Sequence, residues 1–276
     1  MNMSHLQARI DAVNWYHEFD FGNGLKARSM TDVEVHRHIW KFIERHLDAV
    51  DFSDKSVLDI GCWDGYWSFY AERRGARSVL ATDDHTQNWA ARGGLLLARE
   101  LLGSAVEVND EVSVYELETL NRKFDIILFL GVYYHLFDPF YALAQIRHCC
   151  HDDTLVLIDG VEAATLSPAT ALFDFSNHGC EWMPTREALK QLLGAAYFNV
   201  VSVDADLGRG GPGLPGGRLV EIVRNARAGV RRMIGRLGPG PRRTFIKCVP
   251  FEGENAFHYY RPPFGLHRYD PRFRDE

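Results

Sequence analysis

Short apolar runs alternate with amphipathic stretches along most of this 276-residue chain. The apolar runs are rich in β-branched and aromatic side chains and are bounded by turn residues, as in buried strands. Between them, apolar residues recur three and four positions apart, which predicts helices. Strands are predicted at residues 56–60, 79–82, 124–130, 154–158, 198–203 and 244–249, with one more at either 106–108 or 112–115.

Helical patterns separate the strands. We predict a first helix over residues 31–50, with Thr31 as its N-cap and Glu34 as the returning acid of a capping box. Strands that alternate with helices are typical of a parallel sheet covered on both faces, so we predict an α/β, Rossmann-like fold. The remaining helices are predicted at residues 67–74, 89–102, 140–148 and 186–193.

Composition indicates a cytoplasmic protein with one main domain. The chain is 46% hydrophobic, yet it lacks a membrane-spanning apolar run and an amino-terminal secretion pattern. Its five cysteines include no CxxC pair and are expected to be reduced thiols. The run from His148 to His151 contains two of them, but adjacent residues rarely reach one ion, so no metal site is expected. We divide the chain into a cover segment (1–50), a core (51–206), a linker with a basic helix (207–243) and a last strand with a tail (244–276).

The basic helix carries most of the positive charge. The whole chain has a net charge of −6, but arginines outnumber acids nine to one between residues 208 and 243. An apolar stripe runs through residues 218–237, with the arginines mainly off it. Three interpretations are open: packing on the core or on a second subunit in a homodimer, contact with an anionic membrane surface, and binding of RNA phosphates. RNA is the least favoured because the chain as a whole is acidic.

A glycine-bounded turn follows the first predicted strand. Asp59 lies on that strand, and the turn reads Gly61-Cys-Trp-Asp-Gly65. The next strand along the chain ends at Asp83, about twenty residues later, a spacing that indicates a nucleoside pocket. Trp63 and Asp64 place a bulky ring and an anion inside the turn, where both would oppose a pyrophosphate. A cationic sulfonium ligand has no such conflict, so the turn favours S-adenosylmethionine over a dinucleotide.

Three stretches carry a family resemblance. Residues 57–65, 81–83 and 129–139 resemble the class I S-adenosylmethionine-dependent methyltransferases. The last stretch, with Gly131-Val-Tyr-Tyr-His135 before Asp138 and Pro139, is similar to the branch of the tRNA wobble-uridine carboxymethyltransferase and its small-molecule relatives. The resemblance covers about residues 51–206. It implies a seven-stranded sheet in the order 3-2-1-4-5-7-6, with the last strand antiparallel.

The resemblance also implies a cofactor site. Asp59, Gly61 and Gly65 would hold the methionine end of S-adenosylmethionine, and Asp83 would bind the ribose hydroxyls. Ser113 stands where the family often has an acid, which leaves the adenine contact open. The cations of the carboxymethyltransferase are missing, so the unmodified cofactor is expected. The other expected cofactor contacts are Cys62, Trp63, Asp84, Val114, Gly131 and Val132.

His135 is the candidate general base, because it follows the fourth strand beside the expected methyl group and titrates near neutral pH. Tyr134 would orient the acceptor. The alternative is that His135 only shapes its loop. Aromatic and polar residues outside the sheet are candidate substrate contacts, with packing against the core as the alternative. These residues are Trp15, Tyr16, His17, His178 and Trp182.

The expected function is methyl transfer to an oxygen or nitrogen of a small acceptor. The candidate acceptors are a sugar, a nucleoside or a specialised metabolite, either free or lipid-linked. Two alternatives stay open: modification of a tRNA wobble uridine, and a non-catalytic cofactor-binding scaffold.

Overall fold

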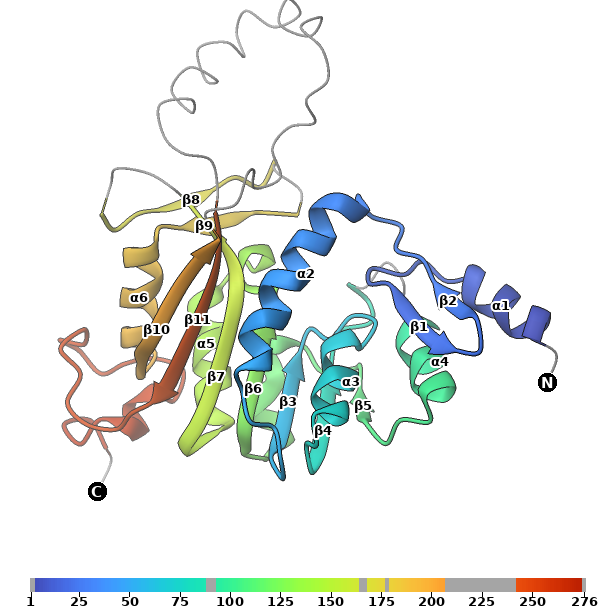
Figure 1. Cartoon of the computed structure of the whole chain (residues 1–276). Helices are drawn as coiled ribbons and strands as arrows, with labels where there is room; N and C mark the ends of the chain where they lie inside the picture. The colour runs from blue at the N-terminus through green and yellow to red at the C-terminus, as the bar shows by residue number, and fades with distance from the viewer. Residues whose placement is uncertain (1–2, 88–92, 164–167, 177–178, 207–241, 275–276) are drawn as a thin grey trace, which may run out of the picture.

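A seven-stranded sheet forms the centre of the protein in a computed structural model that describes residues 3–87, 93–163, 168–176, 179–206 and 242–274 (Figure 1). Its strand order is β10-β11-β7-β6-β3-β4-β5. Neighbouring strands from β5 to β7 run parallel, whereas β11 is antiparallel to both β7 and β10. The expected fold class, strand order and antiparallel last strand are therefore confirmed. The strands are β3 (Ser56–Ile60), β4 (Ser78–Thr82), β5 (Glu107–Asn109), β6 (Phe124–Leu130), β7 (Cys150–Glu162), β10 (Phe198–Asp206) and β11 (Arg242–Pro250).

The sheet divides the hydrophobic core into two parts. Successive strand residues point to opposite faces, so Val57 belongs to one cluster and Leu58 to the other. The first cluster includes α2 (Val33–Asp48), α3 (Tyr66–Arg73) and α4 (Gly93–Leu102). The second includes η1 (Val114–Leu120), α5 (Pro139–His148) and α6 (Arg186–Ala195). Because both faces are covered, the central strands are mainly apolar.

Two small hairpins lie outside the sheet and were not predicted. One joins β1 (Phe19–Gly22) to β2 (Leu25–Ala27) and follows α1 (Met3–Asp11); Figure 1 shows this cover beside α4. The other joins β8 (Ala171–Phe173) to β9 (Trp182–Pro184), and Figure 1 shows it above the carboxyl ends of the parallel strands. Both therefore lie near the end of the sheet where the predicted site is located.

One local prediction was wrong, and of the two alternatives predicted for the third strand, residues 106–108 match β5 (Glu107–Asn109). The first helix begins at Val33 after Asp32, which makes no side-chain cap. Thr31 does not cap it, because its hydroxyl is hydrogen bonded to Ser29 Oγ at 2.7 Å. A capping box forms instead on η1, between Ser113 and Glu116, so residues 112–115 are not the third strand.

Other predictions fall on residues outside the described part of the chain. The predicted helix at 89–102 is described from Gly93, since residues 88–92 lie outside it. The basic segment 218–237 also lies outside, so its packing, membrane and RNA interpretations stay predictions. Among the described residues, no helix is long and apolar enough to cross a membrane.

The carboxyl-terminal segment packs against α5 in a small separate cluster that contains Ala144, Leu266 and Tyr269. The guanidinium of buried Arg147 lies 3.6 Å from the ring centroid of Tyr269 in η4 (Leu266–Tyr269). His148 is held by the Tyr269 hydroxyl at 2.9 Å and the Phe264 carbonyl at 2.7 Å. The histidine–cysteine run therefore anchors the tail, and all five cysteines are free thiols.

A close contact at Gly160 gives a test of this packing. A Cβ atom there would lie 2.3 Å from the Tyr133 ring, so we expect Gly160→Ala to lower the free energy of unfolding by about 2 kcal/mol. Urea denaturation measures the change. Gly93→Ala is the control, because its added Cβ would meet only a Val13 methyl at 3.9 Å. Equal stability of the two variants would contradict the packing described.

Candidate cofactor and acceptor site

The turn after β3 is built so that only glycine fits at its two ends. Gly61 has a φ of +67°, and a Cβ atom there would lie 2.7 Å from Val132 Cγ2. Gly65 has a φ of +79°, and its Cβ would lie 2.6 Å from Leu95 Cδ1. The amides of Gly61 and Cys62 both donate to the Thr82 carbonyl, which ties the turn to β4. Side chains of Val132 and Leu95 thus pack directly against the backbone of the turn, which leaves no room for a Cβ atom at either end.

Asp59 is a buried acid directly before this turn. It is 2% exposed and accepts a hydrogen bond of 2.5 Å from Ser68 Oγ. Burial raises the pKa of Asp59 to about 7, the Ser68 bond opposes that rise, and the nearby Asp83 and Asp64 add to it. A cationic ligand group would relieve this clustering of acids, which fits the ammonium and sulfonium of S-adenosylmethionine.

The acids at the end of β4 are oriented by local bonds. Asp83 Oδ1 accepts from the Asp84 amide at 3.0 Å, and the Asp83 carbonyl accepts from the Val112 amide. The Asp84 carboxylate folds back onto the amide and hydroxyl of Thr86. Ser113 caps η1, in which Val114 is the first residue. The contacts of these residues with a cofactor stay predictions.

The Asp64 carboxylate binds the cover rather than facing the cofactor side. One oxygen accepts from the backbone amides of Tyr16 at 3.1 Å and His17 at 2.8 Å. The other lies 2.7 Å from His17 Nδ1, and the His17 ring stacks on Tyr66 at 4.6 Å. The carboxylate is 1% exposed, so its expected opposition to a pyrophosphate would act through the buried charge rather than through direct contact.

The cover places its three predicted substrate residues differently. Trp15 is 1% exposed, donates its indole N–H to the Ile10 carbonyl and packs on Phe19. The structure assigns Trp15 and His17 to packing inside the cover. Tyr16 alone lies among the polar groups of the site, where burial raises the pKa of its phenol and Tyr134 raises it further.

A buried ion pair lies beside Gly131, at the end of β6. Arg243 donates through Nε to Asp159 Oδ1 at 2.9 Å and through Nη2 to Asp159 Oδ2. Its Nη1 donates to the Tyr134 hydroxyl at 3.2 Å. Gly131 has a φ of +78°, and a Cβ there would lie 3.4 Å from Arg243 Nη2. Asp159 and Arg243 were not predicted, although Asp159 ends an apolar strand run just as Asp59 and Asp83 do.

His135 ends η2 (Tyr133–His135), with its side chain 44% exposed. Its Nδ1 lies 3.5 Å from Glu181 Oε2, and the Glu181 Oε1 accepts from the Gly179 amide at 3.0 Å. Partial burial lowers the pKa of His135, Glu181 opposes that shift, and Arg243 adds to it. Trp182 is buried against Tyr133, whereas His178 lies outside the described residues.

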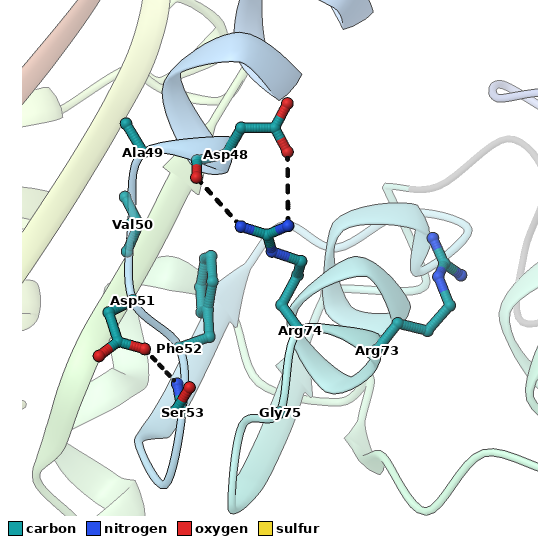
Figure 2. A pocket seen from close by; sticks show the side chains of 9 residues that line it. All are labelled: Asp48, Ala49, Val50, Asp51, Phe52, Ser53, Arg73, Arg74 and Gly75. Carbon is teal, nitrogen blue, oxygen red and sulfur yellow. Dashed lines mark hydrogen bonds and ion pairs between the residues drawn. The ribbon is translucent and has the colours of Figure 1, made fainter.

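A separate hollow of about 720 Å³ opens at the other end of the sheet (Figure 2). It lies where α2 ends, before β3 begins and where α3 ends. Arg74 crosses it to the Asp48 carbonyl at 3.0 Å. Because parallel α/β sheets bind ligands at the carboxyl ends of their strands, this hollow is not the candidate site.

Comparisons with known proteins agree with this geometry. The sequence profile of the family described as "Methyltransferase domain" matches residues 32–203. The chain is 29% identical over 155 residues to the tRNA U34 carboxymethyltransferase of Campylobacter hominis, covering 54% of this chain and 52% of that protein. The same enzyme of Aliarcobacter butzleri is 30% identical over 161 residues, covering 55% and 50%. The chain thus spans about half the length of these curated relatives.

Solved structures share the fold. The N-terminal domain of EvdMO1 with SAH bound superposes with a TM-score of 0.62 at 13% identity, covering 91% of this chain and 97% of that one. The [4+2]-cyclase SpnF superposes with a TM-score of 0.56 at 12% identity, covering 90% and 92%. At such low identity these likenesses concern the fold alone.

The Asp64 bonds predict a coupling between the cover and the turn. Asp64→Ala leaves two backbone amides and the His17 ring without their acceptor, so we expect the free energy of unfolding to fall by about 3 kcal/mol. S-adenosylhomocysteine should also bind more weakly in calorimetric titrations. Exposed Asp152→Ala is the control and should change neither quantity. Wild-type stability and affinity in Asp64→Ala would contradict the coupling.

Asp59 predicts opposite effects on stability and on binding. Because its folded-state pKa lies above the unfolded value, the ligand-free protein loses stability as pH rises from about 4 to about 7. Asp59→Asn removes this loss and should raise the free energy of unfolding at pH 8 by about 1–2 kcal/mol. The same variant should bind S-adenosylmethionine at least tenfold more weakly. A parallel loss of stability and affinity at pH 8 would argue against a charge-based role.

Proposed function

The chain belongs to the methyltransferase domain family, and from this we propose that it transfers the methyl group of S-adenosylmethionine to an oxygen or nitrogen of a small acceptor. The observation that carries the proposal is the position of His135. This half-exposed imidazole lies three residues after Val132, and Val132 packs against Gly61 of the cofactor turn. A base is thus held next to the expected methyl group.

The residues around the turn suit S-adenosylmethionine. Asp59 and Asp83 supply carboxylates for a cationic amino-acid end and for vicinal hydroxyls. When bound, this cofactor supplies an electrophilic methyl group on a sulfonium. Transfer would break the carbon–sulfur bond as the bond from the methyl carbon to the acceptor forms, and the positive charge on sulfur would be lost.

The chain itself would handle the acceptor and its proton. Glu181 Oε2 faces His135 Nδ1 at 3.5 Å, and Nε2 would take the proton that the acceptor releases. The lowered pKa of His135 keeps the imidazole neutral, and therefore basic, at pH 7. Tyr16 and Tyr134 line the same region with hydroxyl groups that can orient the acceptor, and alignment supplies a large part of the acceleration.

Carboxymethyl transfer is less well supported. A carboxylated cofactor needs an available cation, but both oxygens of Asp159 already bind Arg243 beside Gly131. The curated relatives named tRNA U34 carboxymethyltransferase still make tRNA modification the second candidate. Filter binding of tRNA at increasing salt measures whether the chain holds RNA phosphates.

Methyl-labelled S-adenosylmethionine and fractionated cell extract test the proposal directly. We expect label in the small-molecule fraction. Label in tRNA would support the second candidate, and cofactor binding without transfer to any fraction would support a non-catalytic scaffold.

The base predicts a specific pH dependence. Activity should rise as pH increases through the pKa of His135, below 6.5, and His135→Ala should lower kcat by about 10²–10³-fold with unchanged S-adenosylhomocysteine affinity. Because Glu181 raises that pKa, Glu181→Gln should move the acidic limb of the rate profile to lower pH. Exposed Glu187→Gln should leave the profile in place. An unchanged kcat in His135→Ala would remove His135 as the base.

A further inference from the structure

Three phenylalanines lie exposed beside the candidate site and touch one another. Phe137 is 74% exposed, and Phe173 and Phe175 are each 54% exposed. The ring centroids of Phe137 and Phe175 are 5.3 Å apart, and those of Phe173 and Phe175 are 6.1 Å apart. We call these three side chains the aromatic rim. Exposed apolar groups that are contiguous mark binding surfaces, whereas scattered ones do not.

The aromatic rim is continuous with the interior of the site. Phe173 lies 6.1 Å from the ring of buried Trp182, and Trp182 lies 5.8 Å from Tyr133 in η2. Phe137 follows two residues after His135. Figure 1 shows the β8–β9 hairpin above the carboxyl ends of the strands, the end at which the cofactor turn lies. A molecule with its reactive atom at His135 would therefore extend over these rings.

The charges near the aromatic rim select against anionic molecules. Residues 131–141 and 168–184, which supply the rim, contain no lysine or arginine. They do contain Asp138, Asp174 and Glu181, and the adjacent Arg243 is neutralised by Asp159. Phosphates at this position would meet these three acids, whereas an uncharged apolar body would bury the exposed rings.

We propose that the aromatic rim binds the apolar body of the methyl acceptor, an uncharged molecule with an aromatic ring or hydrocarbon chain beside its reactive hydroxyl or amine. This inference rests on the proposed function and narrows its acceptor class. Packing of such a body on the rim would also exclude water from the reacting atoms.

A binding experiment tests the aromatic rim without turnover. The neutral fluorophore N-phenyl-1-naphthylamine is titrated into the full chain saturated with S-adenosylhomocysteine. We expect Phe137→Ser/Phe173→Ser/Phe175→Ser to weaken probe binding at least tenfold and to leave S-adenosylhomocysteine affinity unchanged. Phe257→Ser is the matched control, since Phe257 is also 54% exposed but lies in the carboxyl-terminal segment beside Gly194. Equal probe affinity of the triple variant and the wild type would overturn the proposal.

Two further measurements keep the outcome decisive. If the triple variant unfolds, Phe137→Ser alone should weaken probe binding at least threefold, and no weakening overturns the proposal. In extract labelled by the wild type, label should partition into ethyl acetate as a neutral product, and label in RNA or in anionic water-soluble products would overturn it. Absence of label from every fraction would instead contradict the proposed methyl transfer, and the probe titration would still decide the role of the aromatic rim.

Discussion

The buried carboxylate of Asp64 joins the cofactor turn to the amino-terminal cover, beside ring contacts such as His17 on Tyr66. It belongs to the cofactor turn, yet it accepts hydrogen bonds from two backbone amides and one imidazole of the cover. Because the group is buried, loss of any of these donors would leave an unsatisfied charge. The turn and the cover therefore adopt their positions together. This arrangement carries Tyr16 over the site and places Trp15 in the core.

The Asp159–Arg243 pair has a comparable effect on the acceptor side. It links β7 to the antiparallel β11 beside Gly131, and it cancels the positive charge that Arg243 would otherwise present. Its remaining donor holds the Tyr134 hydroxyl. The acceptor region is thus lined by phenols, an imidazole and phenyl rings around a neutralised cation. Such a surface suits methyl transfer to an uncharged molecule better than transfer of a carboxylated group.

Strong periodic signals predicted most of the fold, and weak local signals failed. The strand at Phe124–Leu130 was predicted at its true bounds, because a run of seven residues that is almost wholly apolar is typical of a strand buried on both faces. The β1–β2 and β8–β9 hairpins were missed, since strands of three or four residues carry too little pattern to stand out. Thr31 matched a capping signature, but Ser29 is a competing partner for its hydroxyl that no local pattern reveals.

The sequence by itself determined the sheet, its cofactor turn and the family, because hydrophobic period, glycine spacing and acids at strand ends are local properties. Only the tertiary structure decided what the side chains of that turn do. Asp64 stands four residues after the end of β3, inside the cofactor turn, yet its donors lie 47 and 48 residues earlier in the cover. Arg243 and Asp159 are 84 residues apart, and no recognisable sequence motif spans that distance. Contacts between residues so far apart in the chain form only when the protein folds, and no residue spacing in the sequence predicts them.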